Sequence, residues 1–80
     1  MKIPRDISGK QLAGDLKKYG YEITRISGSH MRLTTSRISE HHITIPAHKP
    51  LRVGTISSIL KEIAEHFNIS KDDLIKELWR

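Results

Sequence analysis

An apolar stripe in the second half of the chain sets the narrowest limits on its fold. The stripe has the spacing i, i+3, i+4, i+7 and i+11 and consists of Ile56, Ile59, Leu60, Ile63 and Phe67. This spacing places the five side chains on one face of an α-helix, which we predict to begin at residues 53–55. A helix with such a face has to bury it, so the rest of the chain must supply an apolar partner surface.

Two further helices are predicted, one on each side of this segment. Ser8 and Gln11 have the spacing of a capping box, which indicates a helix starting at residue 9. Gly20 ends that helix, because glycine tolerates the left-handed conformation found after helix C-termini. Ser70 is the expected N-cap of a C-terminal helix. The apolar residues of the two helices are Leu12, Ala13, Leu16 and Tyr19 in the first and Leu74, Ile75 and Leu78 in the last.

Three strands are predicted between the first two helices, at residues 21–27, 30–35 and 41–45. The first segment is rich in β-branched residues, which favour strands. Its alternation is imperfect, because Arg25 and Ile26 fall out of phase with Ile23, and this indicates a β-bulge. Pro46 ends the third strand, since proline has no N–H to donate to a neighbouring strand.

The order of these elements predicts an α+β fold. We expect a three-stranded antiparallel sheet packed on helices, in the order α-β-β-β-α, with one additional C-terminal helix. We predict a single domain over residues 1–80, with its core at about 7–67 and the extra helix at about 70–80. The helices cover one face of the sheet, and the other face is expected to stay open, with His30, Arg32, His42 and Thr44 on it.

The charge of the chain predicts a polyanionic or acidic partner. The net charge is +5, with +6 on residues 1–60 and −1 on residues 61–80. A basic surface of this kind suits RNA or an acidic protein. The chain has no cysteine, which excludes disulfides and thiolate metal sites. Residues 1–6 lack the apolar run of a signal peptide and no stretch has transmembrane length, so we expect a cytoplasmic protein without a membrane partner.

The segment at residues 28–33 holds the leading candidate for a catalytic group. His30 follows the Gly28–Ser29 turn at the head of a strand, and Arg32 lies two residues on. Residues i and i+2 of a strand share a face, so an imidazole lies beside a fixed positive charge. Cleavage of RNA through its own 2′-OH needs a base for that proton and a cation for the charged transition state. We therefore predict His30 as the catalytic residue, although a solvent-exposed histidine often has no function.

Other polar residues are predicted to bind RNA or to assist His30. Two arginines flank the turn, and two basic residues precede the second helix, whose N-terminus favours anions. The predicted RNA-binding residues are Arg25, Gly28, Ser29, Arg32, Lys49 and Arg52, with His42 and His48 as auxiliary positions. The histidines at 41, 42 and 48 match no standard zinc pattern, so we expect no metal and no small-molecule cofactor. We expect His66 to be an exposed polar position.

Four short segments together resemble the HicA-type toxins, the RNA-cleaving partners of HicB in type II toxin–antitoxin pairs. They lie at residues 16–22, 28–30, 43–48 and 53–60, and the likeness extends over about residues 7–65. The resemblance implies a fold like the double-stranded-RNA-binding domain. It also implies metal-independent cleavage of mRNA with His30 as the catalytic histidine, and neutralisation by a cognate HicB-like antitoxin.

Residues 66–80 depart from the usual compact unit and carry no net charge, with three Lys or Arg and three Asp or Glu, in contrast to the basic first part of the chain. They are compatible with an extra packed helix, with a contact to the antitoxin, or with shielding of the basic surface. For the whole chain we predict a toxin that is an endoribonuclease (an mRNA interferase) using histidine general-base catalysis. The alternatives are a non-catalytic RNA-binding module of the same fold and a basic protein-interaction domain.

Overall fold

The apolar stripe lies on helix α2 (Val53–Phe67), and its first four residues are buried. The fifth, Phe67, is half-buried at the edge of the core. Asn68 ends the helix in the left-handed conformation, with φ of 55°. The computed structural model describes residues 3–79, so the predictions that concern Met1, Lys2 and Arg80 lie outside the described residues.

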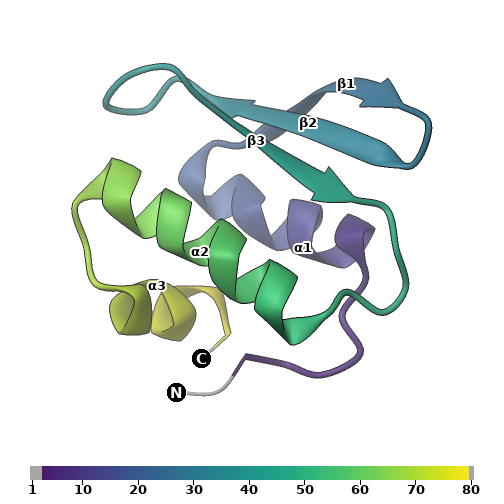
Figure 1. Cartoon of the computed structure of the whole chain (residues 1–80). Helices are drawn as coiled ribbons and strands as arrows, with labels where there is room; N and C mark the ends of the chain where they lie inside the picture. Colours follow the sequence, from purple (N-terminus) through teal and green to yellow (C-terminus); the bar gives the residue numbers. More distant parts are fainter. Residues whose placement is uncertain (1–2, 80) are drawn as a thin grey trace.

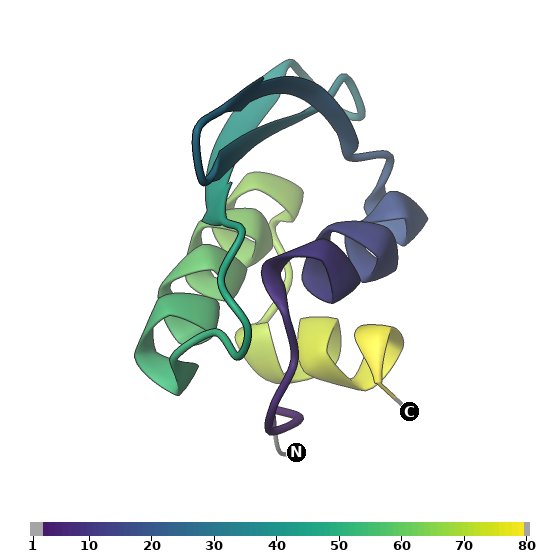
Figure 2. The same cartoon turned by 90° about the vertical axis from the view of Figure 1, so that its right-hand side faces the viewer.

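The elements form a sheet layer with helices on one side of it. In chain order they are α1 (Gly9–Asp15), the 3₁₀ turn η1 (Leu16–Tyr19), β1 (Glu22–Ser27), β2 (His30–Thr35), β3 (His41–Pro46), α2 and α3 (Lys71–Leu78). Figure 1 shows the sheet above α1 and α2, with α3 on their far side. The view in Figure 2 shows α1 and α2 next to each other beneath the sheet. The predicted α+β fold, a helix, three antiparallel strands and then helices, is confirmed.

The first helix starts as predicted but ends earlier. The Ser8 hydroxyl accepts from the Gln11 N–H at 3.1 Å, and the Ser8 N–H donates to Gln11 Oε1 at 2.8 Å, which completes the capping box. The chain then tightens into η1, and Gly20 ends this turn with φ of 82°. A Cβ on Gly20 would lie 2.8 Å from Arg37 Nε. The same Cβ would lie 2.9 Å from Oγ1 of the buried Thr35, so this contact and the positive φ both favour glycine here.

The sheet has the order β1-β2-β3, with antiparallel neighbours. Its inner face is apolar, because Met31 and Leu33 of β2 and Ile43 and Ile45 of β3 are buried against the helices. The residues between them alternate to the outer face and are exposed or half-buried. The predicted open face is therefore confirmed.

Strand β1 pairs with β2 in the sheet but contributes no buried side chain to the core. Its register shifts between Ile23 and Arg25, which confirms the predicted bulge. The shift restores the alternation and sets Arg25 directly opposite Arg32. All six residues of β1 are exposed, including Ile23 at 44% and Ile26 at 67%.

Helix α3 covers the helical layer and leaves the open face of the sheet uncovered (Figure 1). Leu74, Ile75 and Leu78 are buried against the other helices. The following residue, Trp79, donates from Nε1 to Asp15 Oδ2 of α1 at 2.9 Å. Of the roles open to residues 66–80, the structure shows a packed helix away from the open face.

Candidate functional site

An open groove runs between the sheet and α2 and contains the predicted catalytic position. Its volume is about 820 Å³. The sheet contributes His30, Arg32, His42, Ile43, Thr44 and Pro46, and α2 contributes Gly54, Thr55, Ser58, Ile59 and Glu62. The groove thus joins the open face of the sheet to the first turns of α2.

The β1–β2 turn and both neighbouring strands position His30. Gly28 takes the left-handed conformation with φ of 59°, which closes the tight turn. His30 then pairs with Ser27 on one side and Pro46 on the other. The carbonyl of Ser29 also accepts from the Ala47 N–H at 2.6 Å. The backbone of His30 is therefore held from two sides while its side chain is exposed.

The hydrogen bonds of the histidines separate His30 from the rest. Within residues 3–79, the rings of His30 and His48 make no hydrogen bond, and His48 does not line the groove. The rings of His41, His42 and His66 all make hydrogen bonds, and we call such ring nitrogens engaged. Of the described histidines, only His30 combines unengaged ring nitrogens with a place in the groove, as a proton acceptor for a substrate requires.

His41 and His66 form a stacked pair on the inner side of the sheet. Their ring centroids are 4.4 Å apart, with an interplanar angle of 13°. His41 Nδ1 lies 2.7 Å from the Tyr21 hydroxyl, and His66 Nε2 lies 3.0 Å from the carbonyl of Arg37. The prediction that His66 is an exposed polar position is therefore wrong. The end of α2 packs under the start of β3, and local sequence does not show this long-range contact.

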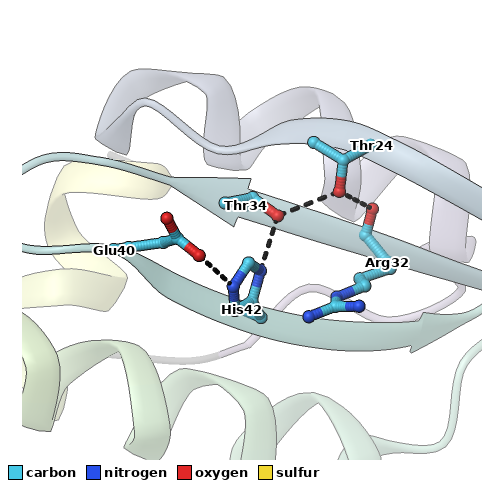
Figure 3. Close-up of polar contacts among 5 residues, drawn as sticks. All are labelled: Thr24, Arg32, Thr34, Glu40 and His42. Atoms are coloured by element: carbon cyan, nitrogen blue, oxygen red, sulfur yellow. Dashed lines mark hydrogen bonds and ion pairs between the residues drawn. The ribbon is translucent and has the colours of Figure 1, made fainter.

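A line of hydrogen bonds crosses the open face beside the groove (Figure 3). His42 contacts Glu40 Oε2 through Nε2 at 2.7 Å and the Thr34 hydroxyl through Nδ1, also at 2.7 Å. The Thr34 hydroxyl lies 2.9 Å from that of Thr24. The Thr24 hydroxyl donates to the carbonyl of Arg32 at 3.3 Å. The two ring nitrogens of His42 are therefore both engaged, in contrast to those of His30.

Sequence reasoning missed Glu40, Thr34 and Thr24 as parts of this site. A signal for the first was present, because Glu40 lies two residues before His42 and so falls on the same side of the chain. Thr24 carried no such signal. It lies at the bulge between Ile23 and Arg25, and its hydroxyl reaches that of Thr34 across the β1–β2 pair.

The structure brings some predicted RNA-binding residues together and separates others. Arg25 and Arg32 are directly opposite on the outer face, next to the turn formed by Gly28 and Ser29. The residues of the β3–α2 connection are exposed but do not line the groove, namely His48, Lys49 and Arg52. A compact patch thus surrounds His30, with further basic residues beyond it.

The first turn of α2 adds to the positive potential of the groove. It contains no acidic residue, and its N-cap, Arg52, makes no side-chain cap. Gly54 and Thr55 of this turn line the groove. The positive end of the helix dipole therefore lies beside Arg32 and His30.

Comparison with family models matches residues 9–64 to the HicA toxin of bacterial toxin–antitoxin systems. This chain belongs to the HicA toxin family. No match was found among curated proteins or among solved structures. The matched part of this HicA toxin runs from α1 to near the end of α2 and contains every residue of the groove, whereas α3 lies outside it. Membership makes the chain the toxin of a toxin–antitoxin pair, with an antitoxin as its partner.

The part of this HicA toxin that the structure describes contains neither a metal-binding cluster nor a membrane-spanning helix. No group of three His, Cys, Asp or Glu side chains in residues 3–79 is arranged to hold a metal ion. Over the same residues, no helix combines the length and the apolar character needed to cross a bilayer.

Proposed function

We propose that this HicA-family toxin is a metal-independent endoribonuclease that cuts mRNA in the cytoplasm, with His30 as general base. The observation that carries the proposal is the unengaged imidazole of His30 in a groove that it shares with Arg32. Membership of the HicA toxin family supports it. The groove is open, so a chain as wide as RNA has access to both side chains.

The chemistry follows from this arrangement. The neutral imidazole of His30 takes the proton of a ribose 2′-OH, and the 2′ oxygen attacks the adjacent phosphorus. The bond from phosphorus to the 5′ oxygen breaks, and that oxygen takes a proton from solvent. The products are a 2′,3′-cyclic phosphate and a 5′-hydroxyl. The guanidinium of Arg32 stabilises the negative charge on the pentacoordinate phosphate.

The paired arginines support a phosphate ligand on this face. Arg25 and Arg32 are directly opposite across an antiparallel pair, where like charges destabilise the sheet. A phosphate between them removes this repulsion. Beside them, a Cβ on Gly28 would meet nothing within 4 Å, so the Gly28–Ser29 turn leaves room for an RNA backbone.

Residues of the β3–α2 connection extend the proposed path of the RNA. Lys49 and Arg52 are exposed there, and so is His48. They lie outside the groove, so we assign them to phosphates away from the cleaved bond. Each adds to the salt dependence of binding and not to the chemical step.

Neutralisation by a HicB-like antitoxin is explained most simply by coverage of the open face. His30 and the arginine pair lie on the open face of the sheet and the groove lies along its edge, and Figure 2 shows α1 and α2 on the other side of the sheet. An antitoxin bound there excludes RNA without changing the fold of the toxin.

The test is cleavage of mRNA by the wild type and by His30→Ala, each with and without EDTA. We expect the wild type to cleave equally in both conditions and the variant to lose at least a hundredfold in rate. Because His30 is exposed and makes no internal hydrogen bond, the variant should unfold at the same urea concentration as the wild type. That measurement is the control for folding.

The other outcomes identify the alternative functions. Salt-sensitive RNA binding without cleavage indicates a non-catalytic RNA-binding module. Absence of any salt-sensitive RNA affinity indicates a basic protein-interaction domain. Cleavage that stops in EDTA, or an equally active His30→Ala variant, contradicts the assignment of His30 as the base.

A further inference from the structure

The hydrogen bonds that run in a line through His42 require a definite number of protons. Four contacts follow one another, from Glu40 to His42, to Thr34, to Thr24 and on to the carbonyl of Arg32. Each contact needs one proton. The carboxylate and the carbonyl at the two ends only accept, so all the protons come from the imidazole and the two hydroxyls.

Only the cationic form of His42 satisfies all four contacts. Two hydroxyls and a neutral imidazole supply three protons, whereas two hydroxyls and an imidazolium supply four. In the complete arrangement, Nε2–H donates to Glu40 and Nδ1–H donates to Thr34. Thr34 then donates to Thr24, and Thr24 donates to the carbonyl of Arg32. A doubly protonated ring of His42 is thus the form that satisfies every contact of the line, including the longest, the 3.3 Å from the Thr24 hydroxyl to the carbonyl of Arg32.

The charge of this ring faces the groove. His42 lines the groove together with Arg32 and His30, whereas Glu40 contacts the ring but does not line the groove. A phosphate in the groove thus meets the imidazolium and not the carboxylate of Glu40. The remaining charged or titratable neighbours are Glu62 of α2, which lines the same groove, and His41 on the inner side of β3.

We propose that His42 is a phosphate-binding cation of the RNA site and that Glu40 and Thr34 are positioning residues that hold its ring in the charged form. This inference rests on the RNA-binding part of the proposed function and is independent of whether His30 is the base. The engaged ring nitrogens also exclude His42 as a second proton acceptor. Its role is electrostatic, next to the guanidinium of Arg32.

The decisive variant is Glu40→Gln, because two hypotheses predict opposite signs for it. Loss of a surface carboxylate alone strengthens RNA binding, since the repulsion of phosphate decreases. If Glu40 holds the charge of His42, its loss weakens binding instead. We measure binding of a single-stranded RNA oligonucleotide in the His30→Ala background, which prevents cleavage, and we expect affinity to fall about three- to tenfold.

Three companion variants assign this effect to His42. His42→Ala should weaken binding by a similar factor and lower the slope of log affinity against log salt by about 0.7, the value for one phosphate on a single strand. In the His42→Ala background, Glu40→Gln should no longer weaken binding. Asp72→Asn removes the same charge from α3, outside the groove, and should not weaken binding.

A spectroscopic measurement tests the proposal without RNA. The ring ¹⁵N signals of His42 report its doubly protonated fraction. At one pH near neutrality, this fraction should be larger in the wild type than in Glu40→Gln or Thr34→Val. Equal fractions in all three proteins contradict the positioning role of Glu40 and Thr34.

The remaining outcomes separate this proposal from the proposed function. Stronger binding by Glu40→Gln in both backgrounds overturns the inference, even if His30→Ala abolishes cleavage. Weaker binding by Glu40→Gln supports the inference, even if the wild type cleaves nothing. A wild type without RNA affinity contradicts both.

Discussion

Three histidines close together in this chain have different properties because of what each ring contacts. His30 has unengaged nitrogens in the groove, whereas both nitrogens of His42 are engaged. His41 is the inward neighbour of His42, and its Nδ1 lies 2.7 Å from the hydroxyl of Tyr21. Residue type alone therefore assigns none of these roles. The partners of each ring differ: unengaged nitrogens suit His30 to the proposed role of base, two engaged nitrogens suit His42 to the proposed role of cation, and His41 is held at the inner side of the sheet beside Tyr21.

The half-buried position of His41 predicts a stability that depends on pH. Burial lowers the pKa of His41, and the stacked His66 ring lowers it further, against a smaller opposite effect of Glu62. Burial likewise raises the pKa of Tyr21 to about 12, so the hydroxyl beside His41 keeps its proton. The folded His41 thus holds its proton less tightly than the unfolded one. As pH falls through about 6.5, the unfolded chain gains protons first and the free energy of unfolding decreases.

Urea unfolding at a series of pH values checks this prediction. Between about pH 7.5 and about pH 5.5, the free energy of unfolding should fall more steeply for the wild type than for His41→Asn. Asparagine at this position still offers an acceptor to Tyr21 but does not titrate. Equal slopes for the two proteins, or a wild type that gains stability in acid, would show that His41 is not the group responsible.

Strand β1 contributes little to the core. All its residues are exposed, Thr24 ends the line of hydrogen bonds through His42, and Arg25 lies opposite Arg32. None of these features improves the packing of the sheet. They are consistent with a strand that presents polar groups to RNA.

The pair of Arg25 and Arg32 predicts that a substitution which raises the stability of the fold lowers its affinity for RNA. Arg25→Thr removes the repulsion from Arg32 and introduces a residue with high strand propensity, so the free energy of unfolding should rise by about 0.5 kcal/mol. RNA affinity should fall, with a smaller salt slope. Lys76→Gln on α3 removes one positive charge elsewhere and should have the weaker effect on affinity. A destabilised Arg25→Thr variant with unchanged RNA binding would contradict this account.

Across the whole molecule, the sheet and α3 lie on opposite sides of the α1–α2 layer (Figures 1 and 2). Helix α3 lies outside the region matched to the family, yet Leu74 is fully buried. Lys18 Nζ also donates to the carbonyl of Glu77 at 3.0 Å. We therefore assign α3 to the stability of this family member and not to its RNA site.

Truncation of a buried side chain in α3 tests that assignment. Leu74→Ala should lower the free energy of unfolding by about 2–5 kcal/mol, a large share of the total for a domain of this size. At a temperature where the variant is still folded, kcat/KM for RNA cleavage should stay within about twofold of the wild type. The exposed Lys76→Ala variant should change stability by less than about 0.5 kcal/mol. A loss of activity in folded Leu74→Ala would instead link α3 to the site.

Local sequence signals were sufficient to predict the helices and strands and to tell the two faces of the sheet apart. The stripe from Ile56 to Ile63, the capping box at Ser8 and the alternation around Leu33 each depend on contacts within a few residues. The out-of-phase Arg25 likewise revealed the bulge. These signals also placed His30 and Arg32 on one face, and they sufficed to exclude disulfides.

Packing between distant segments decided the rest. The seating of α2 against β3 created the groove and stacked His66 on His41, and the docking of α3 kept the outer face of the sheet free. The register of the strands joined Thr24, Thr34 and His42 into one line. Each of these contacts forms between residues far apart in the chain. Such contacts depend on how the side chains of several elements pack together in one core, and the spacing of residues within a single element does not encode this packing.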